Sequence, residues 1–124
     1  MSDAQVSIIR LWDVLLVPLM GDVADHHAEQ ISDVVLDRIA KHGPRGLVLD
    51  LSGVSVVDSH LCSLMANLAA AAGLMGTRAF ISGISAEVAM TLQTMGVTFH
   101  NVETTRGLED ALSKLNIARL EELA

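Results

Sequence analysis

The chain has 124 residues, a formal net charge of −7 and a hydrophobic content of 51%, which favours one folded domain and excludes wholesale disorder. Its acidic balance argues against nucleic acid or an anionic membrane as the main partner, because both attract clustered Lys and Arg. Cys62 is the only cysteine, which excludes an internal disulfide and a cysteine-rich zinc cage and favours a reducing, cytoplasmic location.

The first two apolar runs predict a β-hairpin. Residues 6–11 and 14–20 are rich in Leu and β-branched residues, and Trp12-Asp13 interrupts them. Pro18 is expected near a sheet edge or a strand end, because proline has no backbone N–H to donate.

A helix is predicted from Asp22 onward. Its apolar residues recur at helical spacing and are Ala24, Ala28, Ile31, Val34, Val35 and Ile39. Residues 41–44 (KHGP) form a stop signal.

The next pair of elements places a serine at a helix N-terminus. Residues 46–51 (GLVLDL) are short and nearly all apolar, which predicts a buried central strand. After a connection over residues 52–58, a second helix is predicted to begin near Ser59. Its apolar residues are Leu61, Leu64, Met65, Leu68 and Ala72. The apolar run 61–75 falls short of the roughly 20 residues that cross a bilayer, so no membrane association is expected.

The strand and helix pattern then repeats. Residues 77–81 predict a strand, and Val88, Leu92 and Met95 mark a helix capped by Ser85 and ended by Gly96. Residues 97–102 predict a last strand. A closing helix starts near Thr105 and contains Leu108, Ala111, Leu112 and Leu115, with an extension through Ile117, Leu120 and Leu123.

This alternation predicts a single α/β domain over residues 1–124. Its sheet is expected to be mixed and mainly parallel, with an opening hairpin and about four packed helices. Strands 46–51 and 77–81 are expected to be interior neighbours.

Two clusters invite a reading as chemical sites. Asp58-Ser59-His60 contains the residue types of a catalytic triad, but adjacent side chains splay apart, so no catalytic site is predicted. The residues Asp22, Asp25, His26, His27 and Glu29 could hold a metal ion. An acidic first helical turn explains them better, so no metal site is predicted.

Two further observations bear on reactivity. No glycine-rich phosphate-binding motif is present, so no cofactor is expected. Cys62 lies one turn into the second helix, where a small buried hydrophobe is expected rather than a reactive thiol.

The motif order resembles the STAS family of anti-sigma factor antagonists. Its elements here are Asp50-Leu51-Ser52-Gly53, Val56-Val57-Asp58-Ser59, Gly76, Gly83 and Met95-Gly96-Val97. Within that family the segment 8–18 (IIRLWDVLLVP) and the Asp25-His26 neighbourhood are similar to the short stressosome scaffolds of the RsbS type. Many ordinary antagonists carry D-S-S-G at the switch, whereas this chain has Asp58-Ser59-His60-Leu61, which also favours the RsbS type.

The resemblance implies a non-enzymatic scaffold for stress signalling. By analogy, Ser59 is the phosphorylation site, and Asp58, Ser59 and His60 contact the kinase. The expected partners are an RsbT-like serine/threonine switch kinase, RsbR-like STAS proteins and an RsbX-like phosphatase, in a homo- or hetero-oligomer. The alternatives are a simple antagonist that binds an anti-sigma kinase directly, a small enzyme, and a STAS module of an anion transporter.

Overall fold

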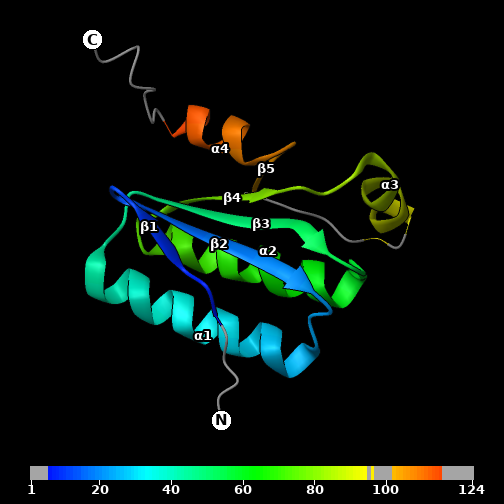
Figure 1. Ribbon diagram of the computed structural model, residues 1–124, viewed down its shortest axis with the longest axis horizontal. Coiled ribbons are helices and arrows are strands. Elements are labelled where there is room, and N and C mark those ends of the chain that lie inside the picture. Colours follow the sequence, from blue (N-terminus) through cyan, green and yellow to red (C-terminus); the bar gives the residue numbers. More distant parts are fainter. Residues whose placement is uncertain (1–5, 95, 97–101, 116–124) are drawn as a thin grey trace.

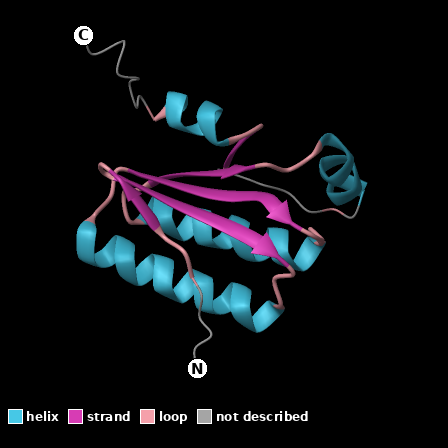
Figure 2. Ribbon diagram, in the orientation of Figure 1, coloured by secondary structure: helices cyan, strands magenta, loops and turns pink. Residues whose placement is uncertain are grey.

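The computed structural model describes residues 6–94, 96 and 102–115 as a sheet flanked by helices (Figure 1). Helices and strands alternate along most of the chain (Figure 2). In chain order they are β1 Ile9–Leu11, β2 Val14–Gly21, α1 Asp25–His42, β3 Gly46–Val54, α2 Ser59–Leu74, β4 Arg78–Ser82, α3 Ala86–Thr94, β5 Glu103–Thr105 and α4 Leu108–Lys114.

The sheet has the strand order β1-β2-β3-β4-β5. β1 pairs antiparallel with β2, and every other neighbouring pair is parallel. α1 and α2 lie on one face, α4 lies on the other, and α3 lies near the carboxyl ends of the strands (Figure 1). The prediction of a mixed, mainly parallel α/β fold with four helices is confirmed, as is the pairing of strands 46–51 and 77–81.

β3 is buried from both sides. Leu47, Leu49 and Leu51 point into the large core between the sheet and helices α1 and α2. Val48 points the other way, into a smaller core with Phe80 and Leu115 beneath α4. A strand with both faces covered shows a continuous apolar run, which explains the pattern of residues 46–51.

Several predicted boundaries were wrong by a few residues. α1 begins at Asp25 rather than near Asp22, because Ala24 still has extended backbone angles and acts as the N-cap. β1 begins only at Ile9, and the pairing that defines it stops there. β4 starts at Arg78, and the Thr77 hydroxyl donates to the Pro44 carbonyl at 2.8 Å.

Two further boundaries differ from the prediction. β3 continues to Val54 rather than ending at Leu51, because the end of β2 pairs with Gly53 and Val54, so the connection to α2 is shorter than the predicted range 52–58. α4 begins at Leu108 rather than near Thr105, because Thr105 still pairs with β4 as the last residue of β5.

The end of the chain is described only in part. The last strand of the described residues is Glu103–Thr105, which begins directly after the last residue of the predicted range 97–102. Residues 97–101, Met95 and the extension through Ile117, Leu120 and Leu123 lie outside the described residues. Ser85 caps α3 as predicted, because its hydroxyl accepts from the Val88 N–H at 3.1 Å.

Pro18 lies inside β2 and is paired in register with Asp50 of β3. β1 pairs only with Val14 to Leu16, so β2 has no partner on that side at Pro18. The register against β3 also shifts between Pro18 and Met20. Pro18 lies neither on an edge strand nor at a strand end, where the sequence predicted it, but inside β2, where the described pairing with β1 has already stopped.

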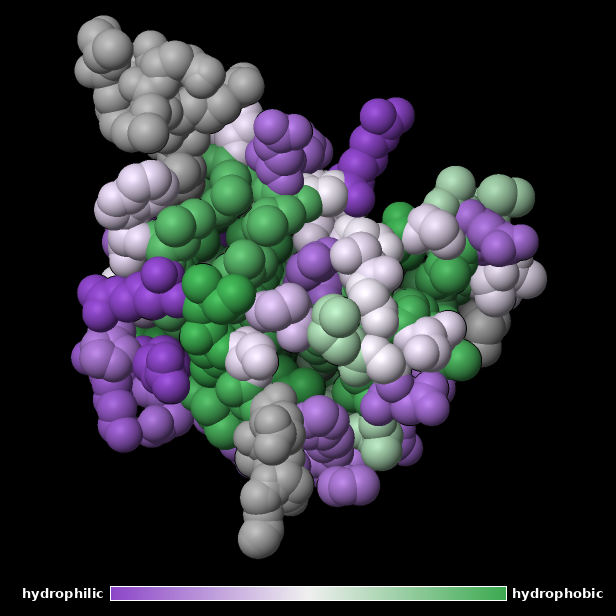
Figure 3. All heavy atoms as spheres, in the orientation of Figure 1, coloured by the Kyte–Doolittle hydropathy of each residue, from purple (hydrophilic) through white to green (hydrophobic). Residues whose placement is uncertain are grey.

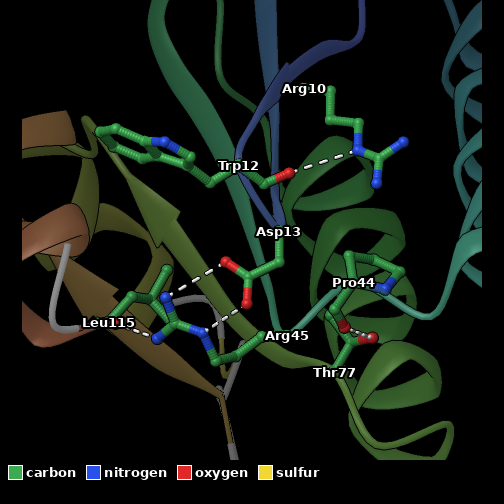
Figure 4. Close-up of polar contacts among 7 residues, drawn as sticks. All are labelled: Arg10, Trp12, Asp13, Pro44, Arg45, Thr77 and Leu115. Carbon is green, nitrogen blue, oxygen red and sulfur yellow. Dashed lines mark hydrogen bonds and ion pairs between the residues drawn. The ribbon is translucent and has the colours of Figure 1, made fainter.

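A polar cluster holds the amino ends of the parallel strands together (Figure 4). Arg45 Nε and Nη2 donate to the two carboxylate oxygens of Asp13 at 2.8 and 3.2 Å, and Arg45 Nη1 donates to the Leu115 carbonyl. The hydrogen bond from Arg45 lowers the pKa of Asp13 below its ordinary value. This cluster connects the β1–β2 hairpin, the α1–β3 loop and the end of α4.

Truncating Leu49 should test the two-sided core. Leu49 is completely buried, so we expect Leu49→Ala to lower the free energy of unfolding by about 2–5 kcal/mol. Leu74→Ala is the matched control, because Leu74 is 91% exposed and should change stability by less than about 0.5 kcal/mol. Urea denaturation measures both variants, and equal effects would contradict the described core.

Candidate functional site

The carboxylate of Asp50 ties together the ends of β3 and β4. Asp50 Oδ1 accepts from the Ser82 hydroxyl at 3.1 Å and from the Ser52 backbone N–H at 3.2 Å. Asp50 Oδ2 accepts from the Ser52 hydroxyl at 3.0 Å. These bonds join the second half of β3 to the last residue of β4.

Gly83 allows the two strand ends to approach this closely. Its φ of +86° lies in the left-handed region. A Cβ atom at this position would lie 2.6 Å from the Ser52 nitrogen and 2.9 Å from Asp50 Oδ1. The glycine is therefore required both by its backbone conformation and by the space around it.

The connection from β3 leads directly to Ser59. The Ser55 N–H donates to the Gly21 carbonyl at 2.9 Å, which anchors this connection to the end of β2. Asp58 is the N-cap of α2, and its Oδ1 accepts from the Leu61 N–H at 2.8 Å. Ser59 is the first residue of α2 and is half-buried, as the prediction of a helix N-terminus required.

His60 joins the starts of two helices. Its Nε2 lies 3.5 Å from Asp25 Oδ1, the first residue of α1, and both side chains are at least half exposed. Sequence reasoning did not predict this pair. The residues are far apart in sequence, and only the packing of α1 beside α2 brings them together.

The structure brings Asp58, Ser59 and His60 to one exposed helix end, but their side chains have different partners. Asp58 binds the Leu61 backbone, and His60 faces Asp25. Within residues 6–94, 96 and 102–115, no hydrogen bond joins Ser59 to either neighbouring side chain. A nucleophile needs such a contact with a base, so this geometry supports a recognition site rather than a triad.

Cys62 is buried one turn into α2, as expected. Burial, and to a lesser extent the charge of Asp58, raises the pKa of the Cys62 thiol to about 11. The thiol is therefore protonated at neutral pH and is a poor nucleophile.

The histidines and carboxylates near the start of α1 are residue types that can bind a metal ion. Among the described residues, no group of three His, Cys, Asp or Glu side chains is placed to hold a metal ion. That part of the chain also contains no helix with the length and apolar character required to cross a membrane.

Comparison with known proteins identifies similar domains. Residues 5–111 match the model of the STAS domain. The RsbT co-antagonist protein RsbRB of Bacillus subtilis is 37% identical over 98 residues, which cover 79% of this chain and 35% of that protein. The chain therefore spans about a third of the length of this relative.

Two solved structures have the same fold. A serine-to-glutamate variant of Moorella thermoacetica RsbS superimposes with a TM-score of 0.79 at 28% identity, over 90% of this chain and 95% of that one. A chain from a solved structure of the stressosome superimposes with a TM-score of 0.74 at 30% identity, and that structure describes the stressosome as a signal integration and transduction hub. That match covers 92% of this chain and all of the other.

A Cβ atom at Gly83 should disturb the site's support. We expect Gly83→Ala to lower the free energy of unfolding by about 1–3 kcal/mol, because it adds both a clash and an unfavourable φ. Gly73→Ala is the control, since Gly73 lies in α2 with open space around it and alanine favours a helix. Thermal unfolding compares the two, and a Gly83→Ala variant as stable as Gly73→Ala would contradict the described contact.

Proposed function

The chain belongs to the STAS domain family of anti-sigma factor antagonists and stressosome proteins, and from this premise we propose that it is a non-enzymatic, phosphorylatable scaffold. In this proposal the chain works in the cytoplasm within a stressosome-type complex. It holds an RsbT-like switch kinase together with RsbR-like STAS proteins. Phosphorylation of Ser59 releases the kinase, and an RsbX-like phosphatase restores the original state.

The position of Ser59 is the observation that carries the proposal. Ser59 opens α2 at an exposed end of the domain, immediately after a loop that the Ser55 N–H anchors to the Gly21 carbonyl. A kinase requires its substrate hydroxyl on an accessible backbone, and this loop and helix end provide one. Asp58 and His60 flank the serine and supply the polar groups that a kinase would contact.

The relatives support the choice of partners. RsbRB is described as an RsbT co-antagonist, which supports a kinase of the RsbT type. The solved RsbS and stressosome chains support an assembly of STAS domains. RsbR-like and RsbS-like proteins are both similar to this chain, and the proposal assigns it the RsbS-like role.

A phosphate on Ser59 should be tolerated by the domain itself. Phosphoserine carries about −1.5 to −2 charges at pH 7. An anion near the positive end of a helix typically gains about 0.3–1 kcal/mol. The fold should therefore survive phosphorylation almost unchanged.

A docked kinase would experience the phosphate differently. Two unit charges about 6 Å apart repel by roughly 3 kcal/mol at an effective dielectric constant near 20. Asp58 already places one negative charge beside the serine, so an acidic group on the kinase would face both the Asp58 carboxylate and the phosphate. Even half of that repulsion weakens binding about tenfold.

Substitutions at Ser59 test the switch directly. We expect Ser59→Ala to bind the RsbT-like kinase as wild type does and to resist phosphorylation. Ser59→Asp should bind at least about tenfold more weakly while melting near the wild-type temperature. Isothermal titration, phosphate mass spectrometry and thermal unfolding measure the three effects.

Ser63→Asp is the matched control, because Ser63 is exposed on α2 one turn beyond Ser59. It adds the same charge and should keep wild-type phosphorylation at Ser59. Full phosphorylation of Ser59→Ala at Ser52, Ser55 or Ser85 would place the switch elsewhere. Productive binding to an anti-sigma kinase, with no assembly alongside an RsbR-like protein, would favour the simple antagonist instead.

The β1–β2 hairpin offers an apolar surface for assembly. Ile9, Trp12 and Met20 are 48%, 62% and 70% exposed. Leu16 packs against the smaller core beneath α4, and Ile9 pairs directly with Leu16, so both lie on the face that carries α4. The Trp12 ring points toward the same side (Figure 4). Figure 3 shows a continuous hydrophobic area over these strands. Exposed apolar areas of this kind favour protein association.

Removing the Trp12 ring should weaken assembly. We expect Trp12→Ala to reduce association with an RsbR-like protein by about 2 kcal/mol, or roughly 30-fold. Met90→Ala is the control, because Met90 is 68% exposed on α3, away from the hairpin. Analytical ultracentrifugation measures the species formed. A strict monomer that forms no heavier species with the partner would remove the scaffold role.

A further inference from the structure

We propose that the groove between α1 and α2 binds a basic helical segment of the kinase that phosphorylates Ser59. This inference rests on the proposed function and adds a docking surface to it. The groove encloses about 350 Å³. Its lining residues are Glu29, Ser32, Asp33, Leu36, Leu64, Asn67, Leu68 and Ala71.

One wall of the groove carries negative charge. Acidic residues recur at every fourth position of α1, at Asp25, Glu29, Asp33 and Asp37, and therefore share one side of the helix. Asp37 pairs with Lys41 at 3.1 Å and Asp25 contacts His60. Within the described residues, Glu29 and Asp33 have no cationic partner. Both are exposed, so their charges are available to another molecule.

The floor and the opposite wall of the groove are apolar or neutral. Leu36 and Leu64 are partly buried and pack against the large core, and Leu68 lies beneath them. α2 contains no Asp, Glu, Lys or Arg from Ser59 to Leu74. The groove therefore combines an apolar floor with a negative charge on one side only.

These features favour a basic amphipathic helix as the occupant. Grooves with an apolar floor accept the apolar face of a helix. Lys or Arg side chains one turn apart on that helix would match Glu29 and Asp33, which lie about 6 Å apart along α1. The net charge of −7 makes a second copy of this chain a less suitable occupant.

The groove begins about one helical turn from Ser59. Its first lining residues, Glu29 on α1 and Leu64 on α2, each lie four residues beyond the Asp25–His60 contact that joins the two helix starts, and His60 directly follows Ser59. α1 and α2 lie side by side on the same face of the sheet (Figure 1). A kinase with a helix in this groove would have its active site near Ser59, so the groove would supply affinity while Ser59 supplies the switch.

The test removes the groove's charge without changing the shape of the side chains. We expect Glu29→Gln combined with Asp33→Asn to weaken kinase binding about tenfold and to reduce its salt dependence. Glu87→Gln combined with Glu109→Gln is the matched control, because it removes the same charge from α3 and α4. This control should bind within about twofold of wild type.

A second pair of variants tests the groove by size. Ala71 lines the groove and Ala70 is exposed beside it. We expect Ala71→Gln to weaken kinase binding at least fivefold and Ala70→Gln to leave it unchanged. Glutamine is a good helix former, so both variants should fold, as circular dichroism would verify.

The outcomes separate this inference from the proposed function. Wild-type kinase affinity in both groove variants, with weaker binding of Ser59→Asp, would overturn the groove and leave the switch intact. Altered assembly with an RsbR-like protein and unchanged kinase affinity would assign the groove to that partner and overturn our choice of occupant. A kinase that binds no form of the chain would overturn both.

Discussion

The carboxylate of Asp50 connects the buried sheet to the loop that presents Ser59. β3 is covered on both faces up to Leu49, and its first polar side chain is that of Asp50, beside the last residue of β4. Hydrogen bonds to Ser52 and Ser82, together with the missing side chain of Gly83, hold the ends of β3 and β4 together. The position of the following loop, and therefore of α2, depends on this junction.

The two ends of the sheet differ in how they are bonded and exposed. At the amino ends, Arg45 binds Asp13 and the carbonyl of Leu115, which joins the β1–β2 hairpin, the α1–β3 loop and the end of α4. At the carboxyl ends, the starts of α1 and α2 remain exposed. In open α/β sheets this second edge is where binding sites form, because loops and helix N-termini converge there. The division leaves the recognition end accessible while the opposite end is held by charge-assisted bonds.

A switch at a helix N-terminus separates stability from recognition. The helix end favours an added anion, whereas a partner docked over the same point is repelled by it. The buried core of β3, α1 and α2 lies behind the site and does not need to move. Under the proposed function, the domain would therefore change its affinity for the kinase without unfolding, and the proposed docking surface on α1 and α2 would keep the partner aligned with Ser59.

The sequence by itself predicted the α/β class, the parallel neighbours β3 and β4, and Ser59 at the start of a helix. These features follow from hydrophobic periodicity, which involves residues close together in the chain. The tertiary structure alone decided the pairing of Asp25 with His60, the Asp50–Ser82 bond and the groove between α1 and α2. Local patterns could not reveal them, because each depends on which helix faces, and which strand ends, the packing of distant segments brings together.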